Sequence, residues 1–250
     1  MEKYCEPHQV NTRLTRAFIS GLLPDNIVSE LNDFGVKTHR LGKSDNMHGE
    51  LAYHPDILLN NVKKGVWLCE NDPKYLPNDI ELGLIKESEV ELGDLYPYDC
   101  PFNNFRLKNM LFCGKSAAHL IISYARYEDM NIVFVPQNYT KCCCVIVNND
   151  AVITSDYYIG RALRRNNYDV LTLDDCPDIG LRGYRHGLIG GCYVKLSKDL
   201  IGFTGNLNKY RYGNDIRDFC ANYGIDAMSL SNEPLYDYGG ILPIAELSDE

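Results

Sequence analysis

Short polar corners recur along this chain of 250 residues, and their repetition constrains the fold more than any other feature. Each corner follows a short apolar segment and precedes another apolar run. The corners recur about every 40 to 50 residues, a period typical of supersecondary units that bury their faces against one another. The residues that mark them are His48, Tyr98, Tyr139, His186 and Tyr238. The chain is therefore predicted to repeat one αβ unit.

The clearest unit spans residues 156–206. Residues 157–165 have apolar side chains at helical spacing, and residues 170–173 are typical of a short strand. A glycine-rich corner at 183–191 leads into apolar runs on both sides of a Ser-Lys-Asp turn, which indicates a β-hairpin over 192–203. The predicted order is helix, strand, corner and hairpin.

The other units follow the same order with local departures. In the first unit we expect hairpin arms at 50–53 and 57–59, joined by a turn at 54–56 near the outer rim. The second unit is degenerate, because proline, asparagine and acidic residues replace a helix over 71–94. The fifth unit lacks a hairpin arm, which residues 10–15 or 18–22 could supply. The expected unit boundaries are roughly 23–60, 62–114, 115–155, 156–206 and 207–247.

The expected fold class is therefore α/β, as a single domain over residues 1–250. It would be a five-unit, pseudo-fivefold α/β propeller closed by the N-terminal segment, since closure removes exposed sheet edges.

Composition excludes several classes of partner. The net charge is −9 and no run of lysine or arginine occurs, which argues against nucleic acid. The N-terminal residues lack a secretory pattern and no apolar stretch approaches a membrane span, so we expect a soluble, cytoplasmic protein. Ten cysteines without a Cys-x-x-Cys pair predict reduced, mostly buried thiols, with no metal and no cofactor.

The repeated units resemble the pentein, or guanidine-modifying-enzyme, fold, and the chain looks nearest to uncharacterised bacterial proteins of that fold. The resemblance covers essentially the whole chain as an architecture. It implies deiminase, amidinotransferase or dimethylargininase chemistry, in which a corner histidine assists a nucleophilic cysteine of the last unit. Acidic residues of the first units would hold the guanidinium group. The fold also has a non-catalytic branch that contains the ribosome anti-association factor.

Three residues are candidates for catalysis. His186 stands at the corresponding corner, and Glu50 lies in the first unit, as does Asp56, where an acid is expected. The last corner, residues 237–243, has glycines and no cysteine. Two alternatives follow: Cys192, downstream of His186, acts as the nucleophile, or the site binds its ligand without covalent chemistry. Cys192 could also be a core residue, and His186 a hydrogen-bonded structural one.

Four further residues are candidates for ligand binding, each with a competing structural role. His48 shares one side of its corner with Glu50, Arg185 precedes His186, Asn206 ends a strand, and Asp237 precedes two glycines. Solvated loop residues and Asx-turns are the competing explanations. The leading hypothesis is an axial polar cleft for a small guanidino- or amide-type ligand, with hydrolysis of a C–N bond as the candidate reaction. The alternative is a non-catalytic interaction module like the ribosome-associated branch.

Overall fold

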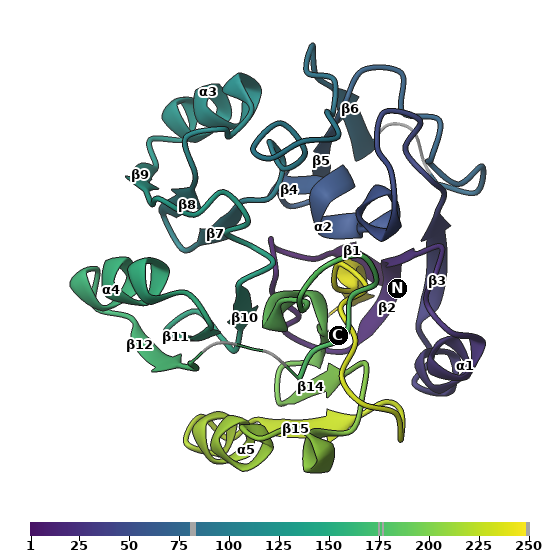
Figure 1. Cartoon of the computed structure of the whole chain (residues 1–250), viewed down its shortest axis with the longest axis vertical. Coiled ribbons are helices and arrows are strands. Elements are labelled where there is room, and N and C mark those ends of the chain that lie inside the picture. Colours follow the sequence, from purple (N-terminus) through teal and green to yellow (C-terminus); the bar gives the residue numbers. More distant parts are fainter. Residues whose placement is uncertain (81–83, 175, 177, 249–250) are drawn as a thin grey trace.

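A computed structural model of the chain describes residues 1–80, 84–174, 176 and 178–248. The strands in these residues form one sheet of four strands and four sheets of three strands. Figure 1 shows the sheets arranged around the centre of the molecule, with helices on the outside. These outer helices are α1 (Asp25–Asp33), α3 (His119–Tyr127), α4 (Tyr157–Arg165) and α5 (Gly213–Ala221). The prediction of a mixed α/β fold is confirmed.

Each three-stranded sheet consists of an antiparallel hairpin and one parallel strand. In chain order the strands are β4 (Asn60–Lys63), β5 (Val66–Cys69) and β6 (Ile85–Glu87); β7 (Phe105–Leu107), β8 (Met110–Cys113) and β9 (Asn131–Phe134); β10 (Cys144–Ile146), β11 (Ala151–Thr154) and β12 (Asp169–Thr172); and β13 (Tyr193–Ser197), β14 (Leu200–Phe203) and β15 (Asp226–Ser229). In three of the four sheets a helix lies between the hairpin and the parallel strand, as a crossover requires. A sheet thus joins the hairpin of one predicted unit to the strand of the next.

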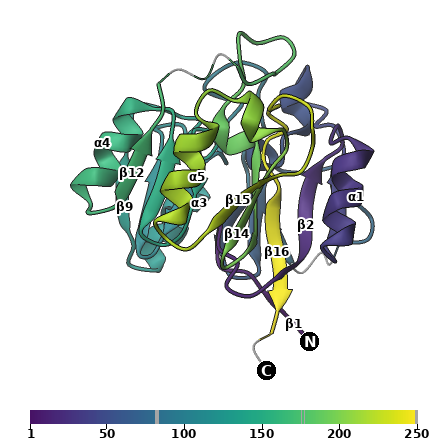
Figure 2. The same ribbon diagram turned by 90° about the horizontal axis from the view of Figure 1, so that it is seen from below.

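The four-stranded sheet combines both ends of the chain. Its order is β1 (Glu2–Tyr4), β16 (Leu242–Leu247), β2 (Leu14–Ser20) and β3 (Lys37–Leu41). Strand β16 pairs antiparallel with β1 on one side and with β2 on the other. Figure 2 shows both termini at one end of the molecule. The green segment that follows residue 177 lies at the opposite end.

The prediction of a hairpin over residues 50–59 is wrong. Residues 50–53 form a 3₁₀ turn, η1 (Glu50–Tyr53), and residues 55–58 form a short helix, α2 (Pro55–Leu58). Proline at the first helical position is compatible with a helix, because its missing N–H would have no partner there. The hairpin follows instead as β4 and β5, with antiparallel pairing. This shift moves residues 54–56 away from the expected outer rim.

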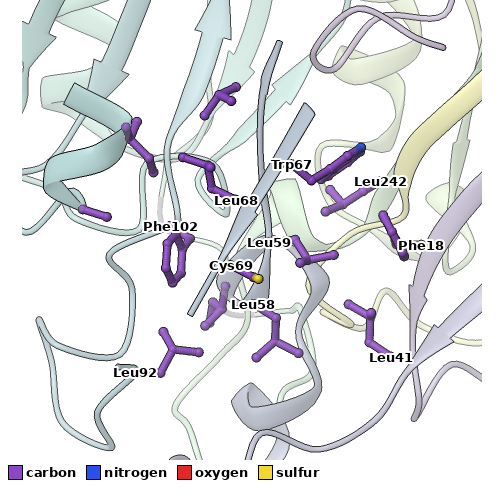
Figure 3. Packing of buried hydrophobic residues seen from close by; sticks show 14 of the residues in the cluster. Phe18, Leu41, Leu58, Leu59, Trp67, Leu68, Cys69, Leu92, Phe102 and Leu242 are labelled. Carbon is purple, nitrogen blue, oxygen red and sulfur yellow. The ribbon is translucent and has the colours of Figure 1, made fainter. Parts of the chain in front are cut away.

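A large apolar cluster packs neighbouring sheets together. Phe18 of β2 and Trp67 of β5 meet edge to face, with ring centroids 5.1 Å apart at an interplanar angle of 82°. Figure 3 shows these rings beside apolar side chains that include Leu58, Phe102 and Leu242. Burying each such side chain stabilises the fold by roughly 1.5–3 kcal/mol. The cluster therefore fixes α2, and the polar residues at its start, relative to the other sheets.

In the described part of the chain, no helix has the length and apolar character needed to span a bilayer.

Candidate functional site

A group of polar side chains is buried where four separate segments meet. It comprises His54, Asp56, Asn103, Lys141, Cys142 and Asp237, hereafter the central cluster, and none of its members is more than 3% exposed. Buried polar groups of this density are rare unless they are paired or functional. The central cluster is therefore the candidate site.

Asp56, Asn103 and Cys142 are in direct contact. The Cys142 thiol donates to Oδ2 of Asp56 at 3.0 Å, and Nδ2 of Asn103 lies 2.9 Å from the Cys142 sulfur. Asn103 also accepts from the backbone N–H groups of Lys141 and Cys142 at 2.8 and 3.1 Å through its Oδ1. Its Nδ2 donates to the backbone carbonyl of Asp56 at 2.9 Å. Asn103 thus joins the start of α2 to the segment before β10.

Asp237 joins the cluster from the last corner. Its Oδ2 accepts from the backbone N–H of Leu188 at 2.8 Å, and its Oδ1 accepts from Gly239 at 2.9 Å. The second bond is the Asx-turn that the sequence suggested. Nδ1 of His54 lies 3.7 Å from Oδ1 of Asp237. Gly239 has a φ of +74°, and a Cβ there would lie 2.4 Å from the His54 side chain, so glycine permits this approach.

Burial sets the charge state of the cluster. It raises the pKa of Asp56 to about 7, against the opposing effect of Lys141. Burial lowers the pKa of His54, which favours a neutral imidazole. Burial and the nearby Asp56 carboxylate raise the pKa of the Cys142 thiol well above its usual range.

Lys141 supplies the positive charge of the cluster. Burial opposes that charge, but neighbouring Tyr193 and Asp56 outweigh it and raise the pKa of Lys141. Its ammonium group donates to the backbone carbonyl of Gly190 at 3.2 Å and lies 4.6 Å from the centroid of the Tyr193 ring. The ammonium therefore remains charged although the residue is buried.

Two polar atoms of the cluster have no hydrogen-bond partner among the described residues. They are Oδ1 of Asp56 and Nδ1 of His54. Leaving a buried polar group unpaired costs about 1–3 kcal/mol. The carboxylate oxygen is a ready acceptor for the N–H of a ligand.

Of the residues that the sequence pointed to, Asp56 and Asp237 belong to the central cluster and Glu50 lies at its edge. Oε2 of Glu50 accepts from the Tyr236 hydroxyl at 2.6 Å and from the backbone N–H of Arg182 at 3.1 Å. The charge of Glu50 also acts on the titration of His54. The placement of His54 and Asp56 at the outer rim is wrong, because each is only 1% exposed.

His186, Arg185 and Cys192 lie on the segment beside the cluster. Nδ1 of the half-buried His186 is 3.0 Å from the carbonyl of Gly187, and Arg185 is exposed and lines an open cleft of about 660 Å³. Cys192 is fully buried, and its thiol donates to the carbonyl of Leu188 at 3.4 Å. Burial raises the pKa of Cys192 well above its usual range. These contacts suit a structural thiol.

His48 and Asn206 have local partners instead. The imidazole of His48 lies 3.0 Å from Asp94 and its side chain is 77% exposed. The side chain of Asn206 accepts from the backbone N–H of Asn208 at 2.8 Å and caps a short 3₁₀ helix, η4 (Leu207–Lys209). The turn explanation therefore accounts for Asn206.

Asn103, Lys141 and Cys142 were missed by sequence reasoning. One signal was available for Asn103: an Asn-Asn pair stands at 103–104 near the start of β7, and another at 60–61 begins β4. Each pair lies at or just before the first strand of a hairpin. A comparable polar signal is absent at Cys142, which stands in a run of three cysteines.

The central cluster does not have the form of a metal centre. In residues 1–80, 84–174, 176 and 178–248, no group of three His, Cys, Asp or Glu side chains is arranged to hold a metal ion.

Sequence comparison assigns the chain to a family through residues 18–242. The chain belongs to the family of unknown function DUF6873. A search of curated proteins found no significant sequence match.

Several solved structures share the fold at low sequence identity. Inosamine-phosphate amidinotransferase from Streptomyces griseus has a TM-score of 0.62 and 11% identity, covering 99% of this chain and 97% of its own. Agmatine deiminase from C. jejuni has a TM-score of 0.54 and 9% identity, covering 92% and 90%. DDAH from Pseudomonas aeruginosa, in complex with citrulline, has a TM-score of 0.53 and 6% identity, covering 88% and 92%. These are pentein-fold enzymes, so the resemblance to the pentein fold is confirmed.

Proposed function

We propose that this protein binds a small guanidino- or amide-type ligand at the central cluster. The observation that carries the proposal is the unpartnered Oδ1 of Asp56, a buried acceptor on a carboxylate. A planar guanidinium or amidine presents N–H donors in the geometry that a carboxylate accepts. Asp237 supplies a second buried carboxylate from the opposite end of the chain. The fold neighbours, among them an agmatine deiminase and an amidinotransferase, suggest the same ligand class.

We also propose how the whole chain is arranged. We propose one domain in which the five sheets form a closed, pseudo-fivefold ring and the N-terminal strand β2 completes the last sheet. The pairing of β16 with both β1 and β2 supports this closure. The central cluster would then lie on the ring axis.

A cytoplasmic location is also proposed, and the ten free cysteines support it, because reduced thiols are typical of that compartment.

Hydrolysis of a C–N bond is the reaction class that we propose for this site. We assign the thiol to Cys142, because its sulfur lies 3.0 Å from a carboxylate oxygen of Asp56, whereas Cys192 contacts a backbone carbonyl. Asp56 would accept the thiol proton as the sulfur bonds to the amidine carbon. The departing amine would take that proton from Asp56 as the C–N bond breaks. Water would then add to the same carbon, one water proton would return to the sulfur as the C–S bond breaks, and the product would leave with the thiol restored.

Access to the cluster requires a movement of residues 181–191. This segment is tied to the site through the Leu188 N–H to Asp237 and through the Gly190 N–H, which donates to the carbonyl of Cys142 at 2.7 Å. Leu188 also packs against two apolar clusters. Because the cluster residues are almost fully buried, the ligand would enter only after these contacts open.

Thermal unfolding with a panel of guanidino and amide compounds tests the binding proposal. A compound that binds the folded state should raise the melting temperature of the wild type. Asp56→Asn should lose this shift, because it removes the carboxylate charge at the site. Asp226→Asn makes the same charge change at an exposed position and should keep the shift. Equal shifts in all three proteins, or no shift with any compound, would contradict the proposal.

The interaction-module alternative is supported by a different observation. Leu95 and Tyr98 are 74% and 72% exposed, and Tyr184 is 50% exposed. Burial and the charges of Asp99 and Asp94 raise the pKa of Tyr184. Exposed aromatic side chains of this kind are typical of protein contacts. Co-sedimentation with ribosomal subunits that depends on Tyr98 would favour this function over ligand binding.

A further inference from the structure

A second cavity lies at the other end of the hairpins from the central cluster. It has a volume of about 270 Å³ and lies between residues 6–11, strand β7 with its turn, and the turn that joins β10 to β11. Asn103 stands just before β7, whereas Arg106 and Lys108 stand within it and just after it. Since a strand rises roughly 3.3 Å per residue, the cavity is separate from the central cluster.

Arg106 brings an uncompensated positive charge to this cavity. Its guanidinium donates to the backbone carbonyls of Val62 and Lys108 at 3.1 and 3.3 Å. In the part of the chain that the structure describes, no carboxylate forms an ion pair with it. Lys108, in contrast, is paired with Asp150. A half-buried guanidinium with neutral partners favours an anion nearby.

Gln9 provides an independent observation at the same place. Gln9 is one of the residues that line the cavity, it is only 7% exposed, and its buried Nε2 has no hydrogen-bond partner among the described residues. Asn11 and Asn149 also line the cavity. An unpaired buried amide donor is costly, and a ligand that accepts a hydrogen bond removes the cost.

We propose that this cavity binds a small oxyanion, a carboxylate or a phosphate group, with Arg106 as the anchor and Gln9 as a neutral donor. The planar guanidinium fork matches both kinds of oxyanion. Glu6 is the one carboxylate among the lining residues, and it opposes an anion. This site does not depend on the function proposed for the central cluster.

Isothermal titration of the full chain with inorganic phosphate and with succinate, at constant ionic strength, tests the site. Saturable binding of phosphate alone would assign a phosphate ligand, and of succinate alone a carboxylate ligand. Arg106→Gln should weaken binding about tenfold or more, because a charge-assisted hydrogen bond is lost. Gln9→Leu should weaken it by a smaller factor.

Three further variants keep the test decisive if Arg106→Gln fails to fold. Glu6→Gln, at an exposed position, should tighten binding because it removes the opposing charge. Arg161→Gln removes a positive charge from an exposed position on α4 and should leave binding unchanged. Asp56→Asn should also leave it unchanged, which separates this site from the central cluster. Absence of saturable binding to both anions, or equal weakening by Arg106→Gln and Arg161→Gln, would overturn the proposal.

Discussion

Asp56 makes the stability of this protein depend on pH. Burial raises the pKa of its carboxyl from 3.8 to about 7, so the folded chain holds the proton more tightly than the unfolded chain. The contribution of this carboxyl to the free energy of unfolding is fully present below about pH 4. It is lost as the pH rises to about 7, and the loss amounts to up to about 4 kcal/mol. Asp56→Asn removes the titration, so its free energy of unfolding should exceed that of the wild type at pH 8 and approach it near pH 4. Urea unfolding at both pH values measures the difference, and a variant less stable than the wild type at pH 8 would contradict this account.

Residues 181–191 form the element that covers the central cluster, and Gly190 packs directly against the backbone of Lys141 and Cys142. A Cβ there would lie 2.4 to 2.6 Å from the carbonyl oxygens of Lys141, Cys144 and Cys142, which are backbone atoms. Gly190→Ala should therefore lift the segment, cost about 1–3 kcal/mol and expose the Cys142 thiol to alkylation. Peptide mass spectrometry after brief labelling locates the modified cysteine. Gly224→Ala is the control, because Gly224 lies outside residues 181–191 and has a φ of +67° with open space around it, so strain alone should destabilise without labelling Cys142.

At the scale of the whole molecule, the two ends of the chain share one sheet. All ten cysteines are free and buried, including Cys5 near the start and Cys220 near the end, which confirms the prediction of mostly buried thiols. If the chain is one cooperative domain, native protein should expose few thiols to titration, and all ten should become reactive over a single denaturant transition. Limited proteolysis should likewise yield no independently folded halves. Two separate transitions, or a stable fragment ending between residues 95 and 115, would show that the chain is divided.

Local elements could be predicted because their signals lie within short windows. The predicted helix over 157–165 coincides with α4, and the predicted hairpin over 192–203 contains β13 and β14. Apolar spacing and turn residues are sufficient for such elements. The prediction failed at residues 50–59, where a short apolar run fits a strand and a helix equally well. In the structure these residues form the helix α2, and its apolar side chains pack in the same cluster as Phe18 and Trp67.

The sequence by itself determined the mixed α/β class, the resemblance to the pentein fold and the presence of an acidic corner at Asp237. Only the tertiary structure decided that His54, Asp56, Asn103 and Cys142 meet that corner. These residues come from segments far apart in the chain, and their proximity depends on how whole sheets pack. Periodicity records which face of an element is apolar, but it carries no information on the distance between elements. The shifted pKa of Asp56 is likewise a collective property, because it arises from burial by atoms of several segments.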